Sequence, residues 1–79
     1  MPVIARFCGI VIRMLYLPLL GLRLHAFHGD AEMVVDLSSL RILENTVPEH
    51  VRLLAMAWIK EHQRELLAGA WGGAPRGFA

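Results

Sequence analysis

The sequence has little that could crosslink the chain or bind a metal through a familiar spacing. Its 79 residues include a single cysteine, and eight basic against seven acidic side chains leave a formal net charge of +1. The lone Cys8 excludes an internal disulfide, so we expect a reducing, cytoplasmic location. Cys8 lies in an apolar run and is interpreted as a small buried side chain rather than a nucleophile. The net charge argues neither for nor against nucleic acid, which stays a possible partner that no motif supports.

Apolar residues, by contrast, are abundant. They make up 56 % of the chain, whereas roughly 45–50 % is ordinary for a globular domain. A chain this short forms one domain whose surface is large relative to its volume, so it cannot bury all of these side chains. We therefore expect part of the excess to cover an interface, with a second copy or with a protein encoded nearby. No motif indicates a cofactor.

The apolar run at residues 7–22 raises the alternative of a membrane segment. A spanning helix needs about 20 mostly apolar residues, and Arg13, Pro18 and Gly21 interrupt this run. No small-residue cleavage site follows it, as a secretory signal would require. A membrane-associated microprotein, with a continuous helix over residues 4–22, is therefore kept only as an alternative, and a membrane is not the expected partner.

The first half of the chain is rich in β-forming residues. Residues 3–16 have two largely apolar faces, which indicates a covered strand or two strands bent at Gly9. Residues 17–22 are expected to be a loop, although an unusually apolar one. Gly29 and Asp30, between two short β-rich runs, are typical of a hairpin turn. The remaining predicted strands are residues 23–28, 32–37 and, as a short partner, 40–43.

The second half predicts one helix, from about Pro48 to Ala68. Thr46 and Glu49 have the spacing of a capping box, and Gly69 is a natural stop. At the helical period, the inward face is predicted to hold Val51, Leu54, Ala55, Trp58, Ile59, His62 and Leu66. A second apolar strip with no internal partner, and therefore a candidate interface, contains Leu53, Met56 and Leu67.

These elements predict an α+β fold, a short antiparallel β-meander of about three to four strands with one C-terminal helix packed on the sheet. A single domain is expected over residues 1–71. Residues 72–79, with three glycines and a proline, are predicted to be a flexible tail.

Four segments of the chain occur in a familiar order. They are Met-Pro-Val-Ile-Ala-Arg-Phe-x-Gly-Ile-Val-Ile-Arg-Met at the start, Leu-His-Ala at 24–26, Ala-Glu-Met-Val-Val-Asp-Leu at 31–37 and Trp-Ile-Lys-Glu-His-Gln-Arg-Glu-Leu-Leu at 58–67. Together they resemble the bacterial domain of unknown function 4160 over residues 1–71. The resemblance implies a β-meander with a C-terminal helix. It also implies a gene next to a second small gene, an arrangement suggestive of toxin–antitoxin pairs, but it brings no established activity.

The chain departs from the family pattern around its histidines. Members usually carry His-Phe-His-Ala after a polar segment, whereas residues 23–26 here are Arg-Leu-His-Ala and residues 17–21 are apolar. A family site that needs both histidines would therefore be impaired. A role in binding a partner would survive these changes more easily.

The histidines are the candidate reactive side chains. His25 and His28 lie three apart on a predicted strand and point to opposite faces. His62 lies in the middle of the inward helix face, where a histidine usually packs with one ring nitrogen bonded to a backbone carbonyl. The alternative is that His62 meets His25 across the sheet–helix contact, with Asp36 or Glu32 orienting one ring. His25, His62 and Asp36 are then candidate catalytic residues, and His25 and His62 are candidate metal ligands.

Charge is unevenly distributed along the chain. Arg6 and Arg13 precede the first acidic residue, Asp30. They could hold a phosphate as a positive strip, but pairing with Asp36 and Glu32 on neighbouring strands is the simpler expectation.

The sequence thus leaves two classes of function open. The leading hypothesis is a protein-interaction module, one member of a toxin–antitoxin-like pair. The alternative is a small metal- or histidine-dependent hydrolase or RNA-cleaving toxin, which would need the candidate side chains to converge.

Overall fold

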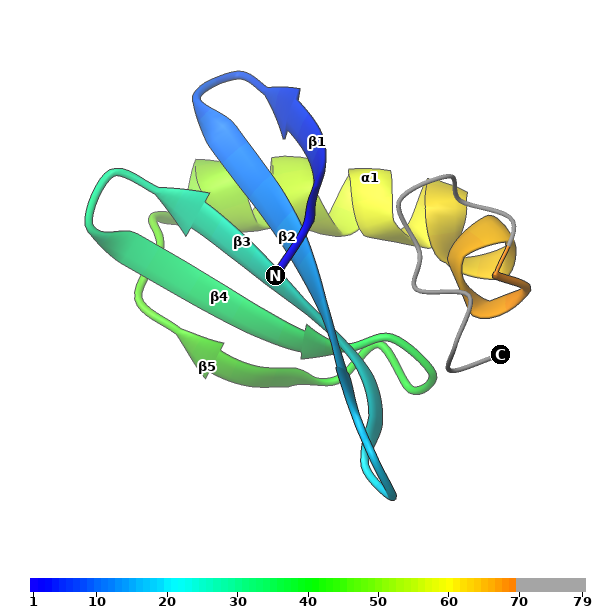
Figure 1. The fold of residues 1–79 in the computed structure, drawn as a ribbon. Coiled ribbons are helices and arrows are strands. Elements are labelled where there is room, and N and C mark those ends of the chain that lie inside the picture. The colour runs from blue at the N-terminus through cyan, green and yellow to red at the C-terminus, as the bar shows by residue number, and fades with distance from the viewer. Residues whose placement is uncertain (70–79) are drawn as a thin grey trace.

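Five antiparallel strands form one sheet in the order of the sequence, and one helix lies across a single face of it (Figure 1). The structure is a computed structural model and describes residues 1–69. The elements are β1 (Val3–Phe7), β2 (Ile10–Leu17), β3 (Gly21–His28), β4 (Ala31–Asp36), β5 (Ile42–Asn45) and α1 (Glu49–Leu67). The predicted α+β meander with a C-terminal helix is confirmed, with five strands instead of three to four.

The connection between β1 and β2 is a two-residue turn at Cys8 and Gly9. Phe7 pairs with Ile10, and both turn residues have left-handed backbones, with φ of 50° and 73°. Two consecutive positive φ angles match the twist of antiparallel strands, which is why such turns favour Gly and Asn. The prediction of two strands bent at Gly9 is confirmed, whereas the prediction that Cys8 is buried is wrong. Its side chain stands exposed at the tip of the turn.

The connection between β2 and β3 is the tip of the longest hairpin. Leu17 pairs with Gly21, and the Leu20 N–H donates to the Leu17 carbonyl at 3.0 Å, closing a turn over Pro18 and Leu19. The expected loop is therefore shorter than residues 17–22. Since residues 4–22 form strands and turns, the continuous helix of the microprotein alternative is wrong. Among residues 1–69, no helix is long and apolar enough to cross a membrane.

Side chains alternate between a face covered by α1 and an open face. The covered face supplies most of the core, in which apolar side chains of the strands meet those of the helix. From the sheet the core contains Ile4, Ile10, Ile12, Met14, Leu22, Leu24, Ala26, Met33 and Val35, and from the helix Val51, Ala55, Met56, Ile59 and Leu66. The residues between them along β2 and β3 are half-buried and point away from the helix.

The start of α1 differs from the predicted capping box. Pro48 is the N-cap, with no side-chain cap, and its carbonyl accepts the Val51 and Arg52 N–H groups. The Thr46 hydroxyl instead accepts the backbone N–H of Glu32 at 2.9 Å. Thr46 therefore fastens the end of β5 to β4, and α1 begins after Pro48 without a side-chain cap. The predicted stop is confirmed: α1 ends at Leu67, and Gly69 has a left-handed φ of 73°.

The helix is also rotated relative to the predicted wheel. Leu54 was assigned to the inward face but is exposed, whereas Met56 was assigned to the outer strip but is 9 % exposed and belongs to the core. Because the sheet is twisted, the line of contact crosses the helix obliquely instead of following one strip. The predicted tail at residues 72–79 lies outside the described residues.

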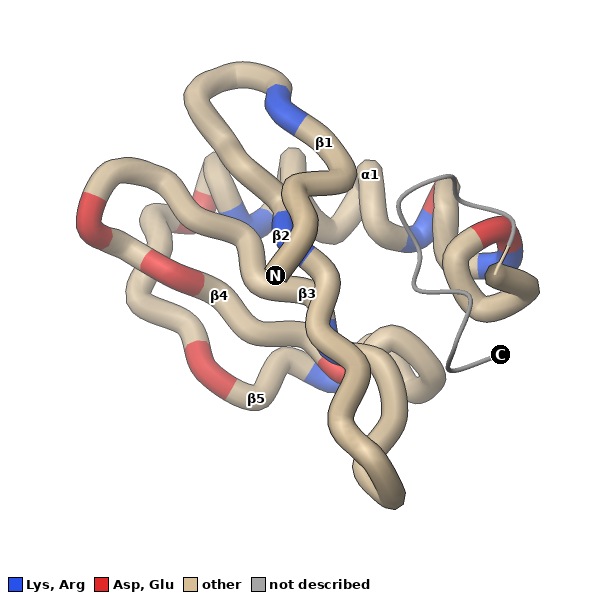
Figure 2. Tube along the Cα trace, in the orientation of Figure 1, with Lys and Arg blue, Asp and Glu red and all other residues tan. Residues whose placement is uncertain are grey.

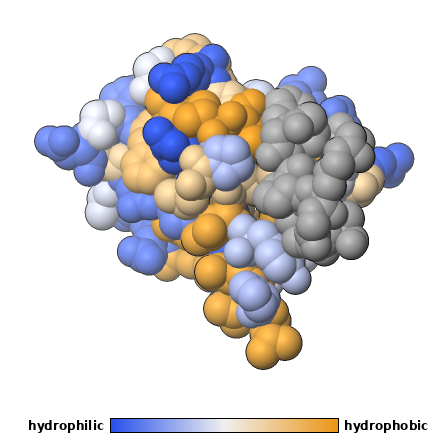
Figure 3. Space-filling view, viewed as in Figure 1, coloured by the Kyte–Doolittle hydropathy of each residue, from blue (hydrophilic) through white to orange (hydrophobic). Residues whose placement is uncertain are grey.

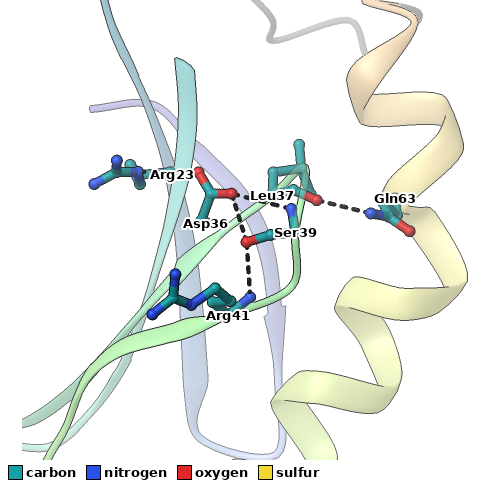
Figure 4. Close-up of polar contacts among 6 residues, drawn as sticks. All are labelled: Arg23, Asp36, Leu37, Ser39, Arg41 and Gln63. Carbon is teal, nitrogen blue, oxygen red and sulfur yellow. Dashed lines mark hydrogen bonds and ion pairs between the residues drawn. The ribbon is translucent and has the colours of Figure 1, made fainter. Parts of the chain in front are cut away.

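The turn between β4 and β5 anchors the sheet to the C-terminal half of α1 (Figure 4). The Asp36 carboxylate accepts the backbone N–H and the hydroxyl of Ser39, at 3.0 and 2.7 Å. The Gln63 side-chain amide reaches across from α1 and donates to the Leu37 carbonyl at 2.8 Å. The turn also holds Leu40 in a left-handed conformation with φ of 63°. These bonds fix the position of the helix along the sheet.

Candidate functional site

The open face of the sheet carries its polar side chains in rows that cross the strands. The register places Arg6, Val11, Phe27 and Glu32 in one row, Val3, Arg13, His25, Val34 and Glu44 in the next, and Leu15, Arg23 and Asp36 in a third. In each row the basic residues lie on β1–β3 and the acidic residues on β4 or β5. Figure 2 shows the same division, with basic positions along β1 and β2 and acidic positions along β4 and β5.

His25 and Glu32 form the chemically most capable contact on this face. His25 Nδ1 lies 2.6 Å from Glu32 Oε2. A carboxylate only accepts, so the ring donates through Nδ1 in this contact, and Nε2 is left for a second partner. Nε2 has no hydrogen-bond partner within residues 1–69. A histidine oriented in this way by a carboxylate can act as a general base.

Two arginines lie beside His25 on the same face. Arg13 is its direct cross-strand neighbour on β2, and Arg23 lies two residues before it on β3. Arg23 pairs with Asp36 at 3.2 Å, while Arg13 uses one N–H to donate to the Met1 carbonyl at 2.9 Å. The expected pairing of opposite charges on adjacent strands does occur, but Arg23 and His25 make these contacts instead of Arg6 and Arg13.

Asp36 serves the turn and not the histidine. The hydrogen bonds from Ser39, together with the nearby Arg23 guanidinium, hold the pKa of the Asp36 carboxyl below its usual value. Its contacts are with Ser39 and Arg23, and Glu32 is the acid that orients His25. The candidate trio of His25, His62 and Asp36 is therefore not brought together.

His62 lies on the other side of the sheet from His25. His25 alternates with the buried Leu24 and Ala26, which face α1, so its own ring points away from the helix. His62 Nδ1 donates to the Trp58 carbonyl at 2.8 Å, and the two rings stack with centroids 4.0 Å apart. This is the contact expected of a packed histidine, and the predicted convergence of His25 and His62 is wrong. Within residues 1–69, no group of three His, Cys, Asp or Glu side chains could hold a metal ion.

Two aromatic contacts were not anticipated from the sequence. Phe27 stacks on His25 along β3, with ring centroids 6.2 Å apart and planes 19° apart. His28 and His50 meet edge to face at 6.1 Å, where the end of β3 approaches the start of α1. Alternation in β3 predicts that residues 25 and 27 share a face. The contact between residues 28 and 50 depends on the tertiary packing of the helix, which no local pattern predicts.

The most exposed apolar side chains of residues 1–69 include Leu19 and Leu20, at the tip of the β2–β3 hairpin. Leu19 is 103 % exposed and Leu20 is 59 % exposed. Figure 3 shows this tip as an apolar projection below the body of the molecule. On α1, Leu53 (55 %) and Leu67 (46 %) are exposed as predicted for the outer strip, but the burial of Met56 removes its middle. No pocket is present in the described part of the chain.

The chain is thus a small α+β protein with a one-sided helical cover, an open polar sheet face and an apolar hairpin tip. The family model for a domain of unknown function (DUF4160) matches residues 9–71, and the chain belongs to this family. No curated protein and no solved structure matches it.

Proposed function

We propose that the chain is a cytoplasmic protein-interaction module, one member of a toxin–antitoxin-like pair, and that the β2–β3 hairpin tip is its binding element. The observation that carries the proposal is Leu19, fully exposed on a left-handed backbone with φ of 72°. A leucine in this conformation is strained, and the exposed side chain gains nothing within the described chain. Strain and an exposed apolar side chain at one position are typical of a binding element.

The composition of the tip supports the same proposal. From Met14 to Leu22 the chain has no charged residue, whereas surface turns usually contain Gly, Asn, Asp or Ser. An apolar projection of this kind can insert into an apolar pocket on a partner and act as a hot spot. Genes of the family that the chain resembles are expected beside a second small gene. The product of that adjacent gene is therefore the first partner to test.

The outer strip of α1 is the less favourable surface. Leu53 and Leu67 lie about four turns apart at 3.6 residues per turn. The exposed Lys60 and Arg64 lie between them on the same side of the helix. The cores of protein interfaces contain few charged side chains, so these two residues make the strip a poor interface core. We therefore propose the strip as a secondary contact only.

Co-purification with the product of the adjacent gene tests the proposal. The Leu19→Asn, Leu20→Asn double variant should lose at least ten-fold in affinity, because each buried leucine contributes about 1.5–3 kcal/mol. Leu43→Gln on β5, where the side chain is also exposed, is the matched control and should bind like the wild type. Sedimentation at micromolar concentration tests self-association in the same way. A tip variant that still co-purifies at wild-type yield would contradict the proposal.

Acid–base chemistry at His25 is the second candidate, and the 2.6 Å contact with Glu32 favours it. A hydrolase or RNA-cleaving toxin would use Nε2 of His25 as the base, with Arg13 close enough to neutralise a phosphate. His25→Asn and Glu32→Gln should each abolish growth inhibition or RNA cleavage, while Glu44→Gln, outside the contact, should not. Unchanged activity in a folded His25→Asn protein would exclude this candidate.

A further inference from the structure

The open face over β1–β3 combines two features that the hairpin tip does not use. Phe27 and His25 form a stacked pair on β3, and Arg6 and Arg13 lie on the same face of β1 and β2. We infer that this face binds single-stranded nucleic acid, with bases stacking against Phe27 and His25 and phosphates contacting Arg6 and Arg13. The inference goes beyond the proposed protein partner and does not involve the tip.

The aromatic pair lies where a strand of nucleic acid could cross the sheet. β3 is the central strand of the five, and Phe27 and His25 are both half-buried on its open side. Their rings are nearly parallel, 19° apart. Unpaired bases stack on such side chains whatever their sequence, because every base has an aromatic face. The pair therefore offers a stacking surface that needs no pocket.

The two arginines are placed to hold the backbone of that strand. Arg6 makes no hydrogen bond or ion pair within residues 1–69, and Arg13 uses only one N–H for the Met1 carbonyl. The first acidic residue in the chain is Asp30, so β1, β2 and β3 contain none. Phosphates are bound by guanidinium groups free of competing carboxylates. Arg23, which is paired with Asp36, adds less.

The acidic residues define where the nucleic acid would not run. Glu32 and Glu44 lie on the same face but on β4 and β5. Their charge repels phosphate, and Glu32 contacts His25 at 2.6 Å, so the phosphates are expected on the β1–β2 side of the aromatic pair, beside Arg6 and Arg13. The overall charge of +1 hides this division, because the two halves of the face cancel.

A single strand suits this face better than a duplex. In a duplex the bases are stacked on one another, so Phe27 and His25 would have no base to contact. RNA and DNA single strands share the required chemistry and are distinguished by testing both. The assay measures nucleic-acid binding and not cleavage or protein binding. Nucleic-acid binding can therefore be absent while the protein interaction is present, and the protein interaction can be absent while nucleic acid binds. If the protein both binds a single strand and cleaves RNA in a way that depends on His25, single-stranded nucleic acid is the substrate class of the hydrolase proposed as the second candidate function.

Fluorescence anisotropy of labelled oligouridylate and oligodeoxythymidylate, each about ten nucleotides long, tests the inference on the full chain. With two arginine–phosphate contacts, log K should fall against log salt with a slope of about −1.4. Arg6→Gln with Arg13→Gln should bring the slope close to zero. The control, Lys60→Gln with Arg64→Gln, removes the same charge from exposed positions on α1 and should keep the slope.

Aromatic substitutions separate stacking from simple charge. Phe27→Leu should weaken binding roughly 5- to 100-fold, while Phe27→Tyr, which keeps the ring, should bind like the wild type. Thermal unfolding of each variant confirms that it is folded. Tighter binding of either single strand than of a duplex of the same length supports the inference. No binding at low salt, equal binding of the duplex, or an unaffected Phe27→Leu variant would overturn it.

Discussion

Replacing Leu19 should make the protein more stable while making it a poorer binder. Leu19 has a φ of 72°, and its side chain is 103 % exposed, so it loses no packing when it is replaced. A left-handed conformation costs an ordinary residue roughly 1–2 kcal/mol, and asparagine tolerates it better than leucine. Leu19→Asn should therefore stabilise the fold by about 0.5–1 kcal/mol. In a domain of this size that corresponds to a rise in Tm of roughly 2–8 °C.

The comparison of three variants makes this prediction specific. Leu20→Asn changes the neighbouring exposed leucine, which has an ordinary backbone, and should not raise the Tm. Leu19→Gly also relieves the strain but increases the freedom of the unfolded chain by about 0.5–1 kcal/mol, so it should gain less than Leu19→Asn. Circular dichroism on heating and urea titration give the values. A fall in Tm for Leu19→Asn, or an equal rise for Leu20→Asn, would refute the reasoning.

Three further predictions concern the core, the β4–β5 turn and the free thiol. Ile59→Ala should destabilise the fold by roughly 2–5 kcal/mol, since the side chain is fully buried, whereas Lys60→Ala should stay within about 0.5 kcal/mol. The folded pKa of Asp36 is lowered, so its stabilising effect is present above the usual value of 3.8 and is lost as pH falls below it. The wild type should therefore have a larger free energy of unfolding in urea at pH 7 than at pH 2.5, and Asp36→Asn should reduce this pH-dependent difference. A variant whose two free energies differ as much as those of the wild type would contradict the prediction. Cys8 is exposed and should react with a thiol reagent in the native protein as fast as in urea, and strong protection would contradict the structure.

The elements that could be predicted from sequence are those whose signals are local. The Gly29-Asp30 turn, the helix and its stop at Gly69 each depend on residues close together in the chain. The connections at Gly9 and within residues 17–22 were also indicated by sequence, but their exact length and backbone conformation were not. Both place a residue other than glycine, Cys8 or Leu19, in a left-handed conformation, which no sequence rule predicts for these residue types.

The errors on the helix have a different origin. A helical wheel predicts which residues share a side of the helix, but it does not predict which side the sheet contacts. Met56 and Leu54 lie near the boundary between the two sides, and the oblique crossing of the sheet decides that Met56 is buried. Thr46 had capping spacing, but its hydroxyl was taken by the Glu32 backbone on β4.

The candidate site was predicted only in part. Glu32 was named as one of two acids that could orient His25, and the structure selects it over Asp36. The selection depends on register, because Glu32 lies diagonally across from His25 while Asp36 lies opposite Arg23. Sequence alone could not exclude His62 from the site. His62 is separated from His25 because α1 packs on the face of the sheet opposite to His25, and the sequence does not reveal which face that is.

The order of the strands has a consequence for how the chain folds. Every strand pairs with its neighbour in sequence, so the whole sheet can form from contacts between nearby residues, which favours rapid folding. All five strands precede the helix, and during synthesis they emerge from the ribosome before it. Until α1 docks, the side chains of Ile12, Leu24 and Met33 face water on one side of a completed sheet. The helix, which is made after all five strands, is therefore the element that keeps the newly formed sheet from aggregating.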